Sequence, residues 1–166
     1  MKKKSIQKHQ PKRKPGAGDP DERATPRDFF DSLHAEYNFT IDACANNRNT
    51  KLARFWTKEQ DGLAQSWRGE TVWCNPPYSN IGAWVAKASE FEADLCVMLV
   101  PAWTDRSWWH DFIEPFRDLA SDGWDGAKIK VRFLEGRIKF SKPGKCEGDG
   151  PAPFGCVLIY FRRGRL

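Results

Sequence analysis

Apolar residues recur along this chain in two rhythms, one of period two and one of helical spacing. The alternation of Phe39, Ile41 and Ala43 predicts a strand over residues 39–44. The continuous apolar run at residues 95–100 is typical of a central parallel strand that is buried on both faces. Further strands are predicted over residues 52–56, 71–74, 128–134, 137–140 and 156–161, with 128–134 and 137–140 forming a hairpin.

Helical spacing marks three further segments. Thr25 followed by Pro26 is typical of a helix start, with Thr25 as the N-cap, and this helix is expected to end near Asn38. Residues 105–116 predict another helix. The remaining helix is predicted from apolar positions at Ile81, Trp84, Val85, Ala88 and Phe91. Strands and helices that alternate in this way favour a three-layer α/β fold with a mixed, mainly parallel sheet.

Charge divides the chain into two parts. The 166 residues carry a net charge of +5, but residues 1–18 hold seven Lys or Arg and no acid. The remainder has 20 basic and 22 acidic residues. We therefore expect residues 1–24 to form a disordered basic tail and residues 25–166 to form one domain. The tail is interpreted either as an arm that contacts nucleic-acid phosphates or as a solubilising terminus.

Composition excludes several classes of protein. No apolar run approaches the ~20 residues of a membrane span, and the tail lacks the apolar segment of a signal peptide. The five cysteines include no Cys-x-x-Cys pair, and the three histidines are scattered. We therefore expect a cytoplasmic protein with no membrane contact and no metal. The cysteines in apolar runs, Cys44, Cys74, Cys96 and Cys156, are predicted to be buried hydrophobic residues, whereas Cys146 lies in a Gly/Pro-rich loop.

The tetrapeptide Asn75-Pro76-Pro77-Tyr78 holds the strongest candidate chemistry. It follows the predicted strand at residues 71–74, at the carboxyl end where open α/β sheets bind ligands. The Asn75 side-chain oxygen and the Pro76 carbonyl can both accept hydrogen bonds from an exocyclic amine, while Tyr78 can stack on the ring that bears it. Pro77 is expected to shape the loop. The purely structural interpretation is that two prolines end a strand and Tyr78 covers the core.

Other segments of the chain join the tetrapeptide in a known order. Together these segments resemble the phage-type DNA N6-adenine methyltransferases, a Dam-like family, over nearly all of residues 25–161. The resemblance implies an enzyme with a Rossmann-like domain that transfers a methyl group from S-adenosylmethionine to adenine N6 in DNA. The base would be flipped out of the duplex. The segments that carry the resemblance are residues 25–30, 39–45, 61–63, 73–79, 99–102, 136–140 and 153–158.

The same resemblance implies roles for residues outside the tetrapeptide. Thr25 and Pro26 match the segment that lines the methionine end of the cofactor, although the pair is equally compatible with helix capping. Asp42, at the end of a predicted strand, would bind the methionine ammonium, or else serve as a helix N-cap or in a loop salt bridge. Asp61 would accept from the adenine amino group of the cofactor, or simply form an Asp-Gly turn with Gly62.

Two rival functions stay open at this point. Methylation of a protein glutamine amide or of an RNA base would use the same tetrapeptide, because an amide nitrogen has a similarly delocalised lone pair. A non-catalytic DNA-binding module would need only the basic tail and aromatic residues such as Trp103, Trp108 and Trp109. The Gly-x-Gly turn of the methyltransferase superfamily is missing after Asp42, so the cofactor loop must be built differently. The oligomeric state and the DNA recognition sequence are left open.

Overall fold

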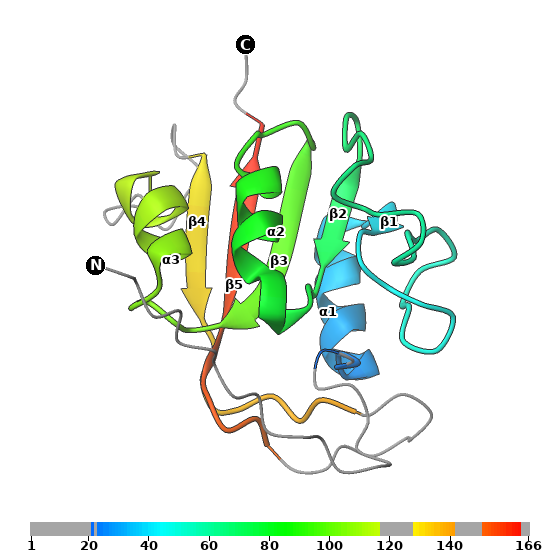
Figure 1. Ribbon diagram of the computed structural model, residues 1–166. Coiled ribbons are helices and arrows are strands. Elements are labelled where there is room, and N and C mark those ends of the chain that lie inside the picture. Colours follow the sequence, from blue (N-terminus) through cyan, green and yellow to red (C-terminus); the bar gives the residue numbers. More distant parts are fainter. Residues whose placement is uncertain (1–20, 22, 117–127, 142–150, 164–166) are drawn as a thin grey trace, which may run out of the picture.

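The structure is a computed structural model that describes residues 21, 23–116, 128–141 and 151–163 (Figure 1). Five strands form one sheet: β1 (Ile41–Asp42), β2 (Thr71–Cys74), β3 (Leu95–Pro101), β4 (Ile129–Phe133) and β5 (Cys156–Arg162). The order across the sheet is β1–β2–β3–β5–β4. β1, β2 and β3 run parallel, whereas β5 is antiparallel to both β3 and β4. The fold is therefore α/β with a mixed sheet, and two of its four pairings are antiparallel.

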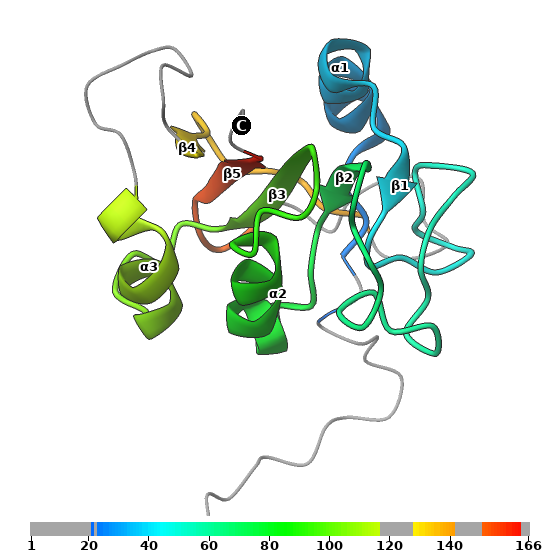
Figure 2. The same ribbon diagram turned by 90° about the horizontal axis from the view of Figure 1, so that it is seen from above.

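Helices cover both faces of this sheet. Figure 2 shows α1 (Arg27–Tyr37) on one face, with α2 (Ile81–Ala88) and α3 (Ser107–Phe112) on the other. Successive residues of β2 point to opposite faces: Trp73 packs with Phe30 of α1, whereas Cys74 belongs to the cluster under α2. Strands covered in this way must be apolar at every position, which is why residues 95–100 and 156–161 are unbroken apolar runs.

Several predicted elements are confirmed with small shifts in their ends. β2, β3, β5 and α1 lie where the sequence places them. α1 ends at Tyr37, and the residue that caps it, Asn38, adopts the left-handed conformation. Thr25 is not the N-cap, because Pro26 occupies that position and no side chain caps the helix. α2 ends at Ala88, before Phe91, whose φ of 54° lies outside the right-handed helical region.

Other predicted elements are wrong or too long. The hairpin between residues 128–134 and 137–140 does not form: β4 pairs with β5, and the chain turns away at Gly136, whose φ is 72°. Apolar β5 gives β4 a partner that is buried on both sides, which the short segment 137–140 cannot offer. Residues 52–56 contribute only a single bridge, between Phe55 and Asp42.

The strand expected over residues 39–44 shrinks to β1, and the helix expected over residues 105–116 splits. Its first part is α3, and a 3-10 turn, η2 (Glu114–Phe116), follows. The break falls at Ile113, whose φ of −110° departs from the regular helical value. The predicted disorder of the tail falls outside the described residues apart from Asp21, Arg23 and Ala24.

A long loop over residues 43–70 joins β1 to β2 without a helix. Gly62 lies so close to this connection that a Cβ atom there would stand 2.1 Å from the Ala43 carbonyl oxygen. The buried Trp67 indole donates to the Gly62 carbonyl across 2.9 Å and holds the loop against the sheet. The loop therefore passes the end of β1 at a distance that only a glycine allows without a shift of the backbone.

Candidate functional site

A cavity of about 500 Å³ opens at the carboxyl ends of the parallel strands. Asp42 ends β1 and Asn75 directly follows β2, so two neighbouring strands bring both side chains to the same edge. This is the edge at which open α/β sheets bind ligands, and the volume lies within the range of small-molecule sites. The lining combines carboxylates, amides, cations and the indoles of Trp73 and Trp84.

Asp42 is the buried acid of this cavity, with 4% of its surface exposed. Burial raises the pKa of its carboxyl group to about 7, although backbone N–H groups of Cys44 and Lys51 and the Lys51 charge oppose the shift. Burial also lowers the pKa of Lys51, and nearby Arg27 lowers it further. A carboxylate that is costly to ionise in the absence of a partner is suited to a cationic ligand that compensates its charge.

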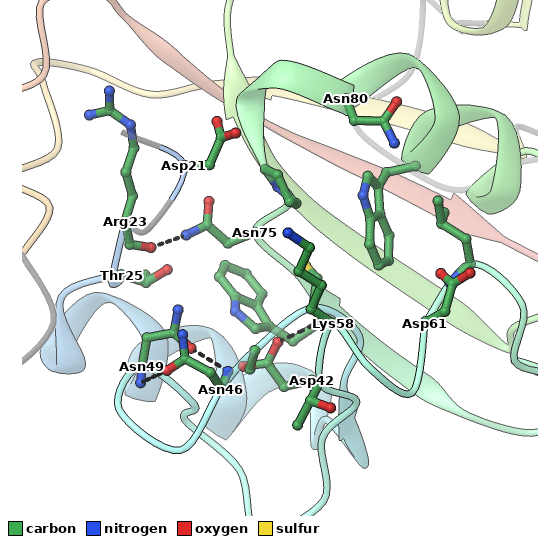
Figure 3. A pocket seen from close by; sticks show the side chains of 18 of the residues that line it. Asp21, Arg23, Thr25, Asp42, Asn46, Asn49, Lys58, Asp61, Asn75 and Asn80 are labelled. Atoms are coloured by element: carbon green, nitrogen blue, oxygen red, sulfur yellow. Dashed lines mark hydrogen bonds between the residues drawn. The ribbon is translucent and has the colours of Figure 1, made fainter. Parts of the chain in front are cut away.

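Asn75 presents an amide of fixed orientation to the cavity. Its Nδ2 donates to the backbone oxygen of Arg23 across 2.7 Å, which Figure 3 marks as a dashed line. Its Oδ1 is buried and accepts no hydrogen bond from any described residue. Because a buried acceptor without a donor costs free energy, a ligand whose N–H group reaches this oxygen would gain by satisfying it.

Tyr78 lies on the other side of the tetrapeptide and does not line this cavity. Its ring packs edge-on against Trp103, Phe140 and Phe154, with centroids 5.6–6.2 Å apart, and the guanidinium of Arg23 sits 5.1 Å above it. Burial raises the pKa of its phenol well above the usual value, and the hydroxyl has no partner in the described structure. Tyr78 instead lines a smaller hollow of about 300 Å³.

That smaller hollow is lined by two of the tryptophans that the sequence groups together, Trp103 and Trp108. Trp103 lines it and is half-buried, and Arg106 lies 5.3 Å above its ring. Trp108 and Trp109 belong to α3 itself and point into the core, where both are buried. Trp84 is also in the core, as its helical spacing predicts, but its indole forms part of the cavity wall.

The other predicted site residues divide between the cavity and its surroundings. Thr25, Asp61 and Pro77 line the cavity, whereas Pro26 and Pro76 do not. Thr25 is 3% exposed. Asp61 has a φ of 51°, and its Oδ1 accepts from the Leu63 amide, so the Asp-Gly turn does form beside the cavity. Figure 3 shows Asp61 well apart from Thr25 and Asn75, with Lys58 between them.

Sequence reasoning missed several residues of this cavity. Lys51, Lys58, Asn46 and Asn49 come from the loop over residues 43–70, whose path carries no periodic signal. Asn46 and Asn49 brace each other through hydrogen bonds between their side chains and backbones. Asp21 and Arg23 also line the cavity, although they precede the expected start of the domain at residue 25. A charged pair beside Thr25-Pro26 offers no pattern from which this contact can be predicted.

No described part of the chain shows a group of three or more His, Cys, Asp or Glu side chains arranged to hold a metal ion. Within the same residues, every helix is too short or too polar to traverse a bilayer.

Comparison with known proteins gives this cavity a context. The family model described as DNA N-6-adenine-methyltransferase (Dam) matches residues 14–164, so the chain belongs to that family. The phage proteins that it resembles carry the same description. One, from Haemophilus phage HP1 (strain HP1c1), is 42% identical over 72 residues, which are 42% of this chain and 42% of that protein. Another, from Escherichia phage T1, is 32% identical over 110 residues, 64% of this chain and 45% of that protein.

The matched stretches thus span less than half the length of each relative. The match to the family model begins seven residues before Asp21 and therefore covers both Asp21 and Arg23. Arg23 accepts a hydrogen bond from Asn75 of the tetrapeptide, and Asp21 accepts one from the serine that follows it. Membership in this family places the chain among proteins described as DNA N-6-adenine-methyltransferases.

Proposed function

We propose that the chain transfers a methyl group from S-adenosylmethionine to adenine N6 in DNA. Family membership and the names of both phage relatives support the substrate and the reaction. The single observation that carries the proposal is the Asn75 side chain, which faces the cavity with its amide N–H committed to Arg23 and its oxygen unpaired among the described residues. An acceptor held in this way suits a group that donates N–H, as adenine N6 does.

The cavity fits the cofactor in size and chemistry. We assign the methionine ammonium to Asp42 and the adenine amino group to Asp61, both of which line the cavity. We assign the methionine end also to Thr25, which lines the cavity, and to Pro26, which follows Thr25 in sequence but does not line it. The buried Asp42 carboxylate, with its raised pKa, supports the first of these assignments, because an ammonium offsets the cost of ionising it. When bound, S-adenosylmethionine supplies a sulfonium-activated methyl group, and no metal is needed to activate it.

The tetrapeptide prepares the target amine. Two acceptors, Asn75 Oδ1 and the Pro76 backbone carbonyl, would take hydrogen bonds from the N6 amino group and draw its nitrogen toward tetrahedral geometry. The lone pair is then less delocalised into the ring and points at the methyl group. Pro77, with a φ of −55°, fixes the turn that presents them. This is catalysis by preorganised dipoles, and removing one such dipole costs enzymes roughly 100- to 1,000-fold in rate. The Tyr78 ring would hold the flipped base by stacking.

We further propose that these residues belong to a Rossmann-like domain of three layers. Helices on opposite sides of the sheet support this arrangement (Figure 2). For the basic residues near the N-terminus we propose contact with DNA phosphates, since seven Lys or Arg occur there without an acid. Neutralising all seven would steepen the salt dependence of DNA binding by about six logarithmic units per unit of log salt.

The experiment that tests this function offers one labelled cofactor to three acceptors. The full chain is incubated with labelled S-adenosylmethionine and adenine-unmethylated bacterial DNA, total RNA, or a glutamine-containing peptide, each with an Asn75→Ala control. We expect label in DNA as N6-methyladenine, and none with the variant. Label only in RNA or peptide would assign the tetrapeptide to another substrate. DNA binding without any label would make the chain a non-catalytic module.

A further inference from the structure

The segment just before α1 lies beside the tetrapeptide, and other parts of the chain hold it at both of its ends. We call it the strap: Asp21 and Arg23–Thr25. At its start, the Ser79 amide donates to Asp21 across 3.1 Å, and the Ser79 hydroxyl donates to the same carboxylate. At its other end, Ala24 and Ser141 form an antiparallel bridge with two hydrogen bonds of 3.0 Å. The main chain of Arg23 is therefore held in place from two directions.

Arg23 meets the tetrapeptide with two different groups. Its backbone oxygen accepts from Asn75 Nδ2, which fixes the amide in the orientation that leaves Oδ1 unpaired among the described residues. Its guanidinium lies over the rings of Tyr78 and Phe154, 5.1 and 5.6 Å from their centroids. The guanidinium carbon thus covers a ring face, whereas Trp103, Phe140 and Phe154 approach Tyr78 edge-on.

The guanidinium is held by weak interactions. Its Nε is buried and finds no acceptor among the residues that the structure describes. Within that part of the chain its main contacts are the two ring faces, and a cation over an aromatic ring contributes only modestly. The planar guanidinium, with its unsatisfied Nε–H donor, can be displaced by another planar group that stacks on the ring equally well. The displaced cation must then find a better hydrogen-bond acceptor elsewhere.

We propose that the Arg23 side chain is a placeholder for the target base, which leaves the Tyr78 ring when an adenine stacks there. This inference rests on the proposed function, because it requires Tyr78 to bind a base. The two halves of Arg23 then act separately: its main chain stays and orients Asn75, while its side chain gives up the ring. Guanidinium groups bind phosphates well, so the displaced cation would find a partner on the DNA backbone.

A double-mutant cycle between Arg23 and Tyr78 tests the placeholder. The variants are Arg23→Met, which keeps the apolar stem without the planar cation, Arg23→Ala, Tyr78→Leu, and each Arg23 variant combined with Tyr78→Leu. The probe is deoxyadenosine, which carries no phosphate for the displaced guanidinium to bind, titrated by calorimetry in the presence of S-adenosylhomocysteine. Without the cation, binding should tighten roughly two- to thirtyfold, the range of a cation–π contact. The gain should vanish when Tyr78 is Leu.

Three results would overturn the placeholder: unchanged binding by both Arg23 variants, weaker binding, or a gain that persists with Tyr78→Leu. Melting curves of each variant show whether it is folded. Arg23→Met controls for the packing that Arg23→Ala loses, because methionine keeps an apolar stem of similar length. Transfer to DNA is measured alongside, with KM and kcat separated. A parent chain that labels DNA while the cycle shows no gain refutes the placeholder alone. A parent that labels no DNA refutes the proposed function.

Discussion

Asn75 and Tyr78 are three residues apart, yet they lie in different surroundings. Asn75 faces the 500 Å³ cavity between the ends of β1 and β2, with one amide oxygen unpaired among the described residues. Tyr78 is enclosed by aromatic rings and covered by a guanidinium. The two prolines between them turn the chain so that one side chain faces each way. The polar side thus borders an open cavity, whereas a guanidinium covers the ring on the aromatic side.

The largest effect is expected from removing the amide of Asn75, the polar member of this pair. Asn75→Ala deletes the unpaired acceptor and should lower methyl transfer to DNA by about 100- to 1,000-fold. Binding of S-adenosylmethionine should change little, since the group proposed to hold its ammonium is Asp42. The measurements are single-turnover transfer and cofactor calorimetry. Asn47→Ala, an exposed asparagine outside the cavity, is the matched control. Near-parent turnover by Asn75→Ala would refute the role of the amide.

The aromatic half is probed by separating the ring of Tyr78 from its hydroxyl. Tyr78→Leu keeps an apolar side chain but loses the stacking face, so DNA affinity should fall by about 5- to 150-fold, the equivalent of 1–3 kcal/mol. Tyr78→Phe keeps the face and removes a buried hydroxyl that has no partner in the described structure, so transfer should persist and thermal stability should not fall. A large loss of transfer with Tyr78→Phe would show that the hydroxyl, rather than the ring, acts on the substrate.

The polar side should also respond to pH. Burial raises the pKa of Asp42 to about 7, so below this pH the carboxyl group is mostly protonated and attracts an ammonium poorly. Cofactor affinity should therefore increase about five- to tenfold between about pH 6 and 7.5. The sign is opposite for folding, because ionising the buried acid costs stability as the pH rises through this range.

Calorimetry across this interval checks the pH prediction, with Asp42→Asn as the control. The variant should bind more weakly and lose the slope. An unchanged slope in Asp42→Asn would assign the titration to another group.

The smallest effect on methyl transfer is expected from a substitution at Gly62, where the loop over residues 43–70 approaches the end of β1. Gly62→Ala places a Cβ atom 2.1 Å from the Ala43 carbonyl oxygen, a contact that the backbone must relieve. We expect a loss of about 1–3 kcal/mol in the free energy of unfolding, typical of overpacking. Gly155→Ala, whose Cβ would meet nothing within 4 Å, is the matched control and should be nearly neutral. Denaturant titration compares the two. Equal stability of both variants would show that the loop gives way at Gly62 without cost.

The elements that the sequence predicts best are those buried on both faces. β3 and β5 are unbroken apolar runs, and no other element fits such a pattern between turn residues. Pairing is harder, because the antiparallel partner of β3 comes from the far end of the chain and displaces the local hairpin expected beside Gly136. A buried strand selects the most apolar partner available, and its position along the chain does not enter.

The site was predictable where a side chain directly follows a strand. Asn75 was predicted in this way, and Asp42, Thr25 and Asp61 through the family resemblance; all four line the cavity, and their roles stay predictions. Lys51 and Arg23 could not be found, because the path of an irregular loop depends on tertiary contacts such as the approach of Gly62 to Ala43. The side to which each side chain of the tetrapeptide points also cannot be predicted from the sequence, because its two prolines follow no strand or helix periodicity. Nothing in the four residues indicates that Tyr78 lies away from the cavity.

The most direct measurement of the central claim is nucleoside analysis of cellular DNA. A host without adenine methylation expresses either the parent chain or Asn75→Ala at matched levels, and its DNA is digested and examined by mass spectrometry. We predict N6-methyldeoxyadenosine with the parent and its loss with the variant. Equal amounts from both, or none from an abundant and folded parent, would contradict the assignment of Asn75 to adenine methylation.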